Sequence, residues 1–232
     1  MQAVRRWRGV GSTLAGLPSA VRRGELRATA RRLLTELGVD LATDTDRLSA
    51  PGGRGTLIVG NHVSWLDIVA ALAVEPPGFL AKAEIAGWPV IGDLARRSGT
   101  AFVARDELRR LPQVVAGLAD TLRSGRSVLV FPEGTTWCGR CGGGTFRRAA
   151  FQAAIDAGAP IRPVTFEYRQ DGEPSTVAAF VGEDTLLASL RRVVHADDLA
   201  VRLIAHEPFE PDGTRRELAA RAEATTRQVV HA

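Results

Sequence analysis

Several residue types and patterns that would assign this chain to a common protein class are scarce or missing. Lysine occurs once, at Lys82, and cysteine twice, at Cys138 and Cys141. No uninterrupted apolar run reaches the roughly 18 residues that mark a membrane-spanning helix. The N-terminus also lacks a long apolar segment followed by a small-residue cleavage site. We therefore expect no spanning helix and no secretory signal.

The overall composition is that of an ordinary globular protein. Apolar residues make up 45% and charged residues 24% of the 232 residues, which suits one domain with a sizeable core. The net charge is only +4, so the chain is not highly cationic. Aromatic residues and arginines are not interleaved as in a nucleic-acid-binding groove, and we expect no nucleic-acid partner.

The basic excess is concentrated at the N-terminus. Residues 1–34 contain eight arginines and one acidic residue, Glu25. Apolar residues lie between these arginines, which predicts a pair of short basic helices broken around residues 16–18. Two interpretations fit. The arm, residues 1–45, lies in an anionic lipid surface, or it is a solvated arm whose apolar stripe faces the core.

The rest of the chain, residues 46–232, is expected to form the main domain and alternates between strand and helix patterns. Short apolar runs predict strands at 56–60, 78–84, 99–105, 127–135 and 159–168, and further runs lie at 175–182 and 199–209. Helical patterns begin at Ser64 and Thr214 and also cover 111–124, 146–158 and 184–194. This alternation favours an α/β fold, a layered sheet flanked by helices, behind a basic amphipathic helical arm.

The two cysteines stand in "TTWCGRCGGG", residues 135–144, which at first sight resembles the active-site motif of thioredoxin. A redox pair of that type needs its first cysteine at a helix N-terminus, and three glycines directly after Cys141 disfavour a helix start. A zinc site would need two further ligands, and only distant histidines are present. We expect an ordinary reduced pair and no metal or other cofactor; a reversible disulfide is the alternative.

His62 is the residue best placed for catalysis. It follows a strand that ends at Gly60 and precedes a helix, so it projects where open α/β sheets bind ligands. Asp67 is close enough in sequence to accept a hydrogen bond from one imidazole nitrogen and leave the other nitrogen basic. A helix-capping cluster, with Asn61 or Ser64 as the cap, is the structural alternative.

No protein nucleophile accompanies this pair in the sequence. The chain contains no Gly-x-Ser-x-Gly elbow, and neither cysteine has a histidine near it in sequence. A His–Asp pair without a nucleophile suits a general base that activates a substrate hydroxyl. The pattern indicates direct transfer of a group onto an alcohol.

Four stretches in order point further: "NHVSWLD" at 61–67, "GTAFVAR" at 99–105, "FPEGT" at 131–135 and "APIRPVTF" at 159–166. The first resembles an Asn-His-x-Ser-x-x-Asp motif. The second matches a Gly-x-x-Phe-x-x-Arg block at Gly99, Phe102 and Arg105, and the fourth is centred on Pro163. Together they resemble the lysophospholipid and glycerolipid acyltransferase family, from about residue 55 to about residue 168.

The resemblance implies a role for each matched residue. His62 is then the general base and Asp67 its orienting partner. They transfer a fatty acyl chain from acyl-CoA or acyl carrier protein to a lyso-lipid hydroxyl, first of all that of 1-acylglycerol-3-phosphate. Substrate-binding roles are implied for Ser64, Lys82, Arg105, Glu133, Gly134 and Thr135. Arg105 would meet an anionic head group, and a backbone N–H near Gly134 would face the oxyanion. A peripheral position on the cytoplasmic face of the cell membrane follows from the same likeness and the basic arm.

One position departs from the family pattern. The third block usually continues with an arginine that contacts phosphate, whereas Thr136 stands here. Arg140, Arg147 or Arg148 would have to substitute for it. An amino-acid-headed or other non-phosphate lyso-lipid therefore stays open as the acceptor. A lipid-binding relative without turnover and a thiol–disulfide protein are the alternatives from other classes.

Overall fold

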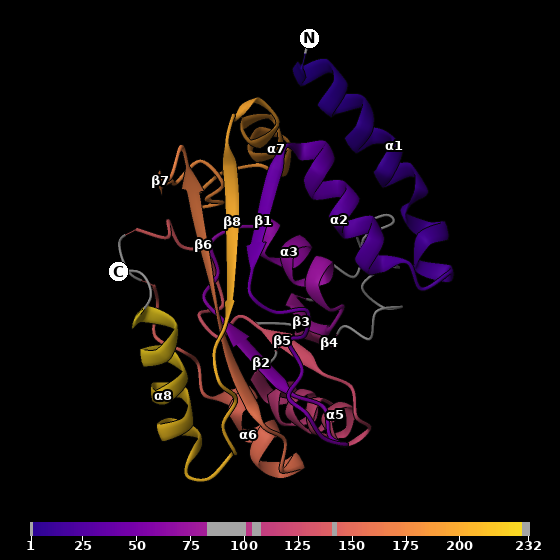
Figure 1. Cartoon of the computed structure of the whole chain (residues 1–232). Helices are drawn as coiled ribbons and strands as arrows, with labels where there is room; N and C mark the ends of the chain where they lie inside the picture. Colours follow the sequence, from indigo (N-terminus) through magenta and orange to yellow (C-terminus); the bar gives the residue numbers. More distant parts are fainter. Residues whose placement is uncertain (1, 83–100, 104–107, 141–142, 229–232) are drawn as a thin grey trace.

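The computed structural model describes residues 2–82, 101–103, 108–140 and 143–228, and these form one mixed sheet with helices on both faces (Figure 1). The α/β architecture expected from the sequence is confirmed. The strands are β1 (Val39–Thr43), β2 (Leu57–Gly60), β3 (Gly78–Lys82), β4 (Ala101–Val103), β5 (Val128–Val130), β6 (Ile161–Gln170), β7 (Glu173–Pro174) and β8 (Leu199–Ala205). The helices are α1 (Gln2–Arg22), α2 (Leu26–Leu37), α3 (Leu66–Val74), α5 (Leu111–Arg123), α6 (Ala149–Ala157), α7 (Leu186–His195) and α8 (Arg215–Arg227), with a short 3-10 turn at Leu108–Arg110.

The order of strands places β2 in the middle of the sheet. It runs β1-β8-β6-β2-β5-β3-β4, and β7 pairs with β6 at the side. β2 pairs in parallel with both β5 and β6, and β8 is antiparallel to β6. All four residues of β2 are buried, as expected for a parallel strand that is covered on both faces. The carboxyl end of β2 therefore opens at the centre of the molecule.

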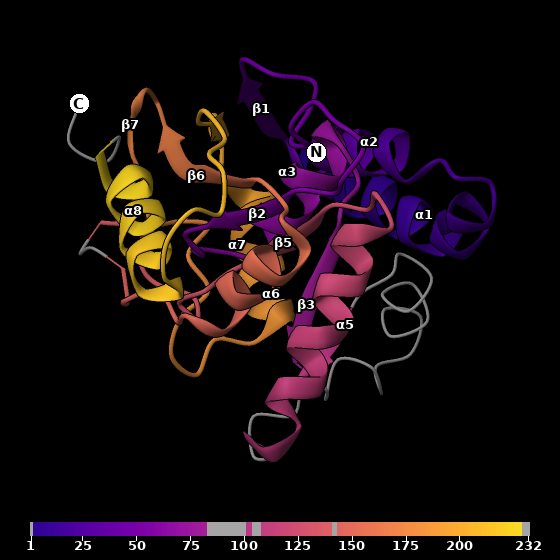
Figure 2. The same ribbon diagram turned by 90° about the horizontal axis from the view of Figure 1, so that it is seen from below.

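The two faces of the sheet have separate cores. Ile58 points to the face that α1, α2, α3 and α7 cover, and it shares a cluster with Leu34, Val69 and Val193. The neighbouring β2 side chain, Val59, points to the opposite face, where α5, α6 and α8 pack. Figure 2 shows α5 and α6 together on one side and α1 and α2 on the other. This alternation follows from the two-residue period of a strand.

The N-terminal helices differ from the expectation. The predicted break around residues 16–18 is wrong, because α1 continues through Pro18 to Arg22 and the chain turns at Gly24. Proline removes one backbone N–H from a helix. Here the buried α1 side chains, Val10, Thr13 and Ala20 among them, keep the helix continuous against the body.

The same segment is also built into the sheet. Residues 39–43, which the sequence pattern did not identify as a strand, form β1 and pair in parallel with β8. Arg6 donates to the carbonyls of Val194 and Ala196 at 2.9 and 2.6 Å, and Arg31 donates to the Ala73 carbonyl at 2.8 Å. Of the described helices, none combines the length and apolar character that crossing a membrane requires.

Candidate active site

The turn between β2 and α3 carries the central residues of the site. Asn61 fixes this turn to β6, because its side chain donates to the Phe166 carbonyl at 2.9 Å and accepts from the Phe166 N–H at 2.8 Å. Gly60 leaves no room for a side chain: an added Cβ would lie 3.0 Å from Phe166 and Val164 atoms. The Asn61 side chain therefore links the end of β2 to β6 and does not cap the helix.

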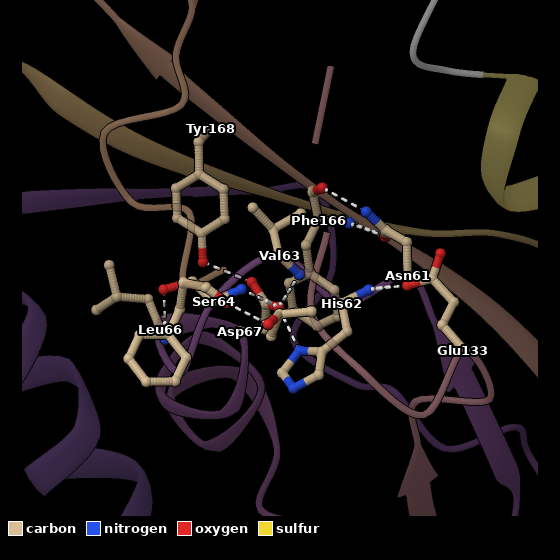
Figure 3. A network of polar contacts seen from close by, with 11 residues as sticks. Asn61, His62, Val63, Ser64, Leu66, Asp67, Glu133, Phe166 and Tyr168 are labelled. Atoms are coloured by element: carbon tan, nitrogen blue, oxygen red, sulfur yellow. Dashed lines mark hydrogen bonds and ion pairs between the residues drawn. The ribbon is translucent and has the colours of Figure 1, made fainter. Parts of the chain in front are cut away.

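His62 and Asp67 meet within this turn, as the sequence predicted. His62 Nδ1 lies 2.8 Å from Asp67 Oδ2, and the same oxygen accepts the N–H groups of Val63 and Ser64 at 2.8 and 2.9 Å (Figure 3). A carboxylate can only accept hydrogen bonds. The proton of a neutral imidazole must then lie on Nδ1, and Figure 3 shows Nε2 pointing away from the carboxylate.

Burial separates the two members of the pair. The Asp67 side chain is fully buried, whereas 18% of the His62 side chain is exposed. The backbone donors around Asp67 compensate for the desolvation of its charge. The sequence also allowed a helix-capping role for Ser64. Its Oγ does accept the Leu66 N–H at the start of α3, at 3.3 Å. Capping and the His–Asp contact thus occur together in this turn.

The imidazole ring is held from behind as well. It stacks on Phe131 with ring centroids 3.9 Å apart and an interplanar angle of 11°. Phe131 in turn packs against Phe166 of β6, with ring centroids 5.9 Å apart. The His62 carbonyl accepts the Trp137 N–H at 2.7 Å. Side chain and backbone of His62 are both fixed, so Nε2 has a defined direction.

Glu133 approaches the same residue from the loop after β5. Its Oε2 accepts the His62 N–H at 2.8 Å, and the residue is 6% exposed. Burial raises the pKa of Glu133 to about 7, against the lowering effects of the hydrogen bonds from the His62 and Gly144 N–H groups and of the Arg227 charge. Glu133 thus holds the backbone of the His62 turn from the buried side.

The residues next to Glu133 form the rim of the site. Gly134 has a φ of +75° and contacts the guanidinium of Arg147, which lies 2.9 Å from where a Cβ would be. The N–H of Gly134 donates to the Phe131 carbonyl at 3.1 Å. Thr135 is exposed. Arg147 is exposed too, and its guanidinium lies next to Gly134.

Beyond this rim the surface is hollowed. Thr136, at the position of the family's arginine, donates its hydroxyl to the Phe180 carbonyl, and the Phe180 N–H donates to the Val63 carbonyl at 3.0 Å. A hollow of about 600 Å³ adjoins these two segments. Its lining residues are Cys138, Arg140, Thr176, Ala179, Val181, Asp184 and Arg192.

Other predicted site residues are placed only in part. Lys82 is the last residue of β3, but its side chain is not described, and Phe102 lies in β4. Gly99, Arg105 and Cys141 lie outside the described residues. Cys138 is half-buried in a loop and not at a helix start. Within the described ranges, no three His, Cys, Asp or Glu side chains converge to hold a metal ion.

Tyr168 is the site residue that the sequence reasoning missed. Its hydroxyl donates to Asp67 Oδ1 at 2.5 Å, 101 positions away in the chain. The fifth predicted strand did include Tyr168, and the strand period places it on the same face as Phe166. No local sequence signal connects that face to Asp67, since the contact depends on the neighbouring positions of β2 and β6.

Comparisons with known proteins identify the family of this chain. The family model described as Acyltransferase matches residues 42–167. The chain belongs to this acyltransferase family. It is 39% identical, over 185 residues, to the lyso-ornithine lipid O-acyltransferase of Pseudomonas aeruginosa, covering 78% of this chain and 70% of that protein.

One further relative and one solved structure also match this acyltransferase. The chain is 35% identical, over 178 residues, to the 1-acyl-sn-glycerol-3-phosphate acyltransferase of Neisseria meningitidis, covering 74% of this chain and 69% of that one. The crystal structure of the acyltransferase PlsC from Thermotoga maritima has the same fold, with a TM-score of 0.64 at 20% identity, over 99% of this chain and 96% of that one. The chain is an O-acyltransferase of the kind that acts on lyso-lipids.

Proposed function

We propose that His62 is the general base of this acyl transfer and that Asp67 orients it. The observation that carries the proposal is the contact of His62 Nδ1 with the buried Asp67 carboxylate, which leaves Nε2 unprotonated and directed outward. An imidazole held in this tautomer can take a proton from a bound hydroxyl. The Asp67 carboxyl group takes part in four hydrogen bonds that hold it in place.

The reaction then needs no covalent enzyme intermediate. The acceptor hydroxyl gives its proton to His62 Nε2 while its oxygen attacks the carbonyl carbon of the acyl thioester. The tetrahedral intermediate collapses by breaking the carbon–sulfur bond. The leaving thiolate takes the proton from His62, so the products are an ester and a free thiol. The Thr135 N–H, which has no partner in the described part of the chain, is our candidate for the oxyanion donor.

The head group is proposed to be anionic, with 1-acylglycerol-3-phosphate as the first candidate. Arg147 beside Gly134 and Arg140 at the hollow are exposed, and their guanidinium groups have no hydrogen-bond partner among the described residues. Arg147 lies at the rim and Arg140 at the hollow beyond it. Fixed guanidinium groups suit a phosphate or carboxylate group.

A second candidate acceptor is an amino-acid-headed lyso-lipid. The neutral Thr136 and its contact with the Phe180 carbonyl favour it, because this position supplies no charge for a phosphate. The hollow carries Arg140 and the Asp184–Arg192 ion pair, so groups of both signs lie within reach of a zwitterionic head group. A relative 39% identical to this chain is named for such a substrate, a lyso-ornithine lipid.

Purified protein incubated with labelled acyl thioesters and a panel of lyso-lipids tests these proposals. Acyl-CoA and acyl carrier protein are compared as donors. Lysophosphatidic acid, lyso-ornithine lipid and a zwitterionic lysophospholipid are compared as acceptors. Product with lysophosphatidic acid alone supports the first candidate, and product with lyso-ornithine lipid alone supports the second. No transfer to any acceptor, by protein shown to be folded, contradicts the proposed function.

The outward side of α1 is proposed to hold the enzyme at an anionic membrane surface on the cytoplasmic side. Val4 and Leu14 are 59% and 43% exposed there, and Arg5 and Arg8 are exposed on the same helix. Each arginine near such a surface contributes on the order of 1 kcal/mol. Replacing Arg5 and Arg8 by Glu should release the protein from phosphatidylserine vesicles in flotation. The matched change of the exposed Arg215 and Arg216 on α8 should not, and equal release would place the contact elsewhere.

A further inference from the structure

Tyr168 is joined to the pair from the far side of the carboxylate. Its side chain extends from β6, the residue is 4% exposed, and its hydroxyl donates to Asp67 Oδ1 at 2.5 Å (Figure 3). Burial and the nearby Asp67 raise the pKa of the phenol well above its usual value. The hydroxyl therefore keeps its proton and acts as a donor.

The hydrogen bonds of Asp67 divide between its two oxygens. Oδ2 accepts from three groups of its own turn, among them His62 Nδ1. Oδ1 accepts from Tyr168, which belongs to a different strand. A carboxylate held at both oxygens cannot rotate about its last bond without losing a partner. Tyr168 therefore fixes which oxygen faces the imidazole.

The strand carrying Tyr168 is also tied to the turn at a second point. Phe166, two residues earlier on β6, exchanges two hydrogen bonds with the Asn61 side chain and packs against Phe131, on which the His62 ring stacks. Side chains two apart on a strand share a face. One face of β6 thus supports both the imidazole and the carboxylate.

We propose that Tyr168 is a positioning residue that sets the orientation and the basicity of the His62–Asp67 pair. The proposal rests on the function proposed above for His62 and Asp67. The donor on Oδ1 draws negative charge away from the oxygen that faces the imidazole. Without it, the carboxylate would hold the protonated imidazole more strongly and also rotate more freely. The first change lowers the unprotonated fraction of His62 at neutral pH, and the second loosens the orientation of its ring.

Other charged and titratable groups lie around the His62–Asp67 pair and could also affect its pH profile. Glu133, from the loop after β5, contacts the His62 backbone and itself feels the charge of Arg227. Phe180 donates its N–H to the Val63 carbonyl, and Asp184, four residues later, forms an ion pair with Arg192 of α7. Ser64 shares a hydrogen bond with the Tyr168 hydroxyl. In a Tyr168→Phe protein Ser64 loses this partner, while the contacts named here for Glu133, Asp184 and Arg192 are kept.

The kinetic experiment compares wild type, Tyr168→Phe, Asp67→Asn and the double variant. Tyr168→Phe keeps the ring and should lower kcat/KM about ten-fold, the size expected for losing a hydrogen bond to a charged group. The acid limb of its pH profile should move to higher pH. In the Asp67→Asn background the same change should cost less than two-fold, because the interaction is already lost.

A buried hydroxyl on the opposite face of the same strand supplies the control. Thr165 is fully buried and bonds His206 and Thr226, so Thr165→Val should affect stability without moving the pH profile. A Tyr168→Phe profile identical to wild type, or a full ten-fold effect on top of Asp67→Asn, would overturn the proposal.

A spectroscopic measurement keeps the test independent of turnover. Tyr168 is the only tyrosine in the chain, so a protein labelled with 13C at the tyrosine ζ carbon gives one resonance. That resonance should shift in Asp67→Asn and stay in place in Thr165→Val. An unmoved resonance in Asp67→Asn would overturn the proposed contact. If His62→Ala kept full turnover while the resonance still responded to Asp67, the proposed function would fail and the contact would stand.

Discussion

The turn at residues 61–67 and the loop at 135–147 lie side by side but are built in opposite ways. In the turn, Asp67 is fully buried and has four hydrogen-bond partners. In the loop, Trp137 is 38% exposed and Arg147 points to solvent beside Gly134. A rigid turn suits a base that must hold one direction, and an open rim suits contact with a varied head group. The difference suggests that chemistry and acceptor choice are separable in this enzyme.

Removing the base should have the largest effect. We expect His62→Ala to lower kcat about 10²- to 10⁴-fold, the usual contribution of general base catalysis, on every acceptor alike. The fold should survive, since the Glu133 contact is with the backbone N–H of residue 62. Product formation and thermal unfolding of the two proteins check both parts. Turnover close to wild type would contradict the mechanism.

Changing the loop should act on some acceptors and not on others. Arg147→Ala should lower kcat/KM for lysophosphatidic acid about 10- to 100-fold, as for a lost charge-assisted hydrogen bond of roughly 1.5–3 kcal/mol. The neighbouring exposed arginine is the matched control, so Arg148→Ala should change little. An equal loss of kcat/KM in both variants, or the same loss with an uncharged acceptor, would show that Arg147 does not bind the head group.

Glu133 connects the two regions, and its effect should appear in stability. Its pKa of about 7 in the folded protein lies above the ordinary value of 4.5. The stability from this group is therefore fully present below about pH 4.5 and is lost as the pH rises towards 7. The loss amounts to about 3 kcal/mol, at 1.36 kcal/mol per pKa unit. Urea unfolding at pH 5 and pH 7.5 should show a smaller difference between the two pH values in Glu133→Gln than in wild type. An unchanged difference would assign the dependence to other groups.

The smallest effect is expected from the cysteines. Replacing Cys138 and Cys141 together by Ser should leave transfer within about two-fold of wild type, because neither thiol has a role in the proposed chemistry. Activity of the wild type in oxidant and in reductant gives the second comparison. A strong loss in the variant, or reversible inactivation by oxidant, would make the loop a redox gate.

Features that depend on residues close together in the sequence could be predicted, whereas features that depend on residues far apart could not. His62 and Asp67 are five residues apart. The spacing of apolar residues around them predicts a strand followed by a helix, so their contact could be predicted. Most of the described strands and helices were predicted for the same reason. The predicted break at residues 16–18 was wrong and the strand at 39–43 was missed. In both cases packing of the arm on α3, α7 and β8 outweighs the local sequence signal, that of Pro18 in the helix and that of a short, half-exposed strand.

The sequence alone determined the reaction class and the His–Asp pair, because both depend on residue types at short, fixed spacings. Only the tertiary structure decided how that pair is supported. Glu133 reaches the His62 N–H across 71 positions and Tyr168 reaches Asp67 across 101. Both contacts exist because β5 and β6 lie on either side of β2 in the sheet. Strand order is fixed by the burial of whole faces, which no single local stretch of sequence encodes.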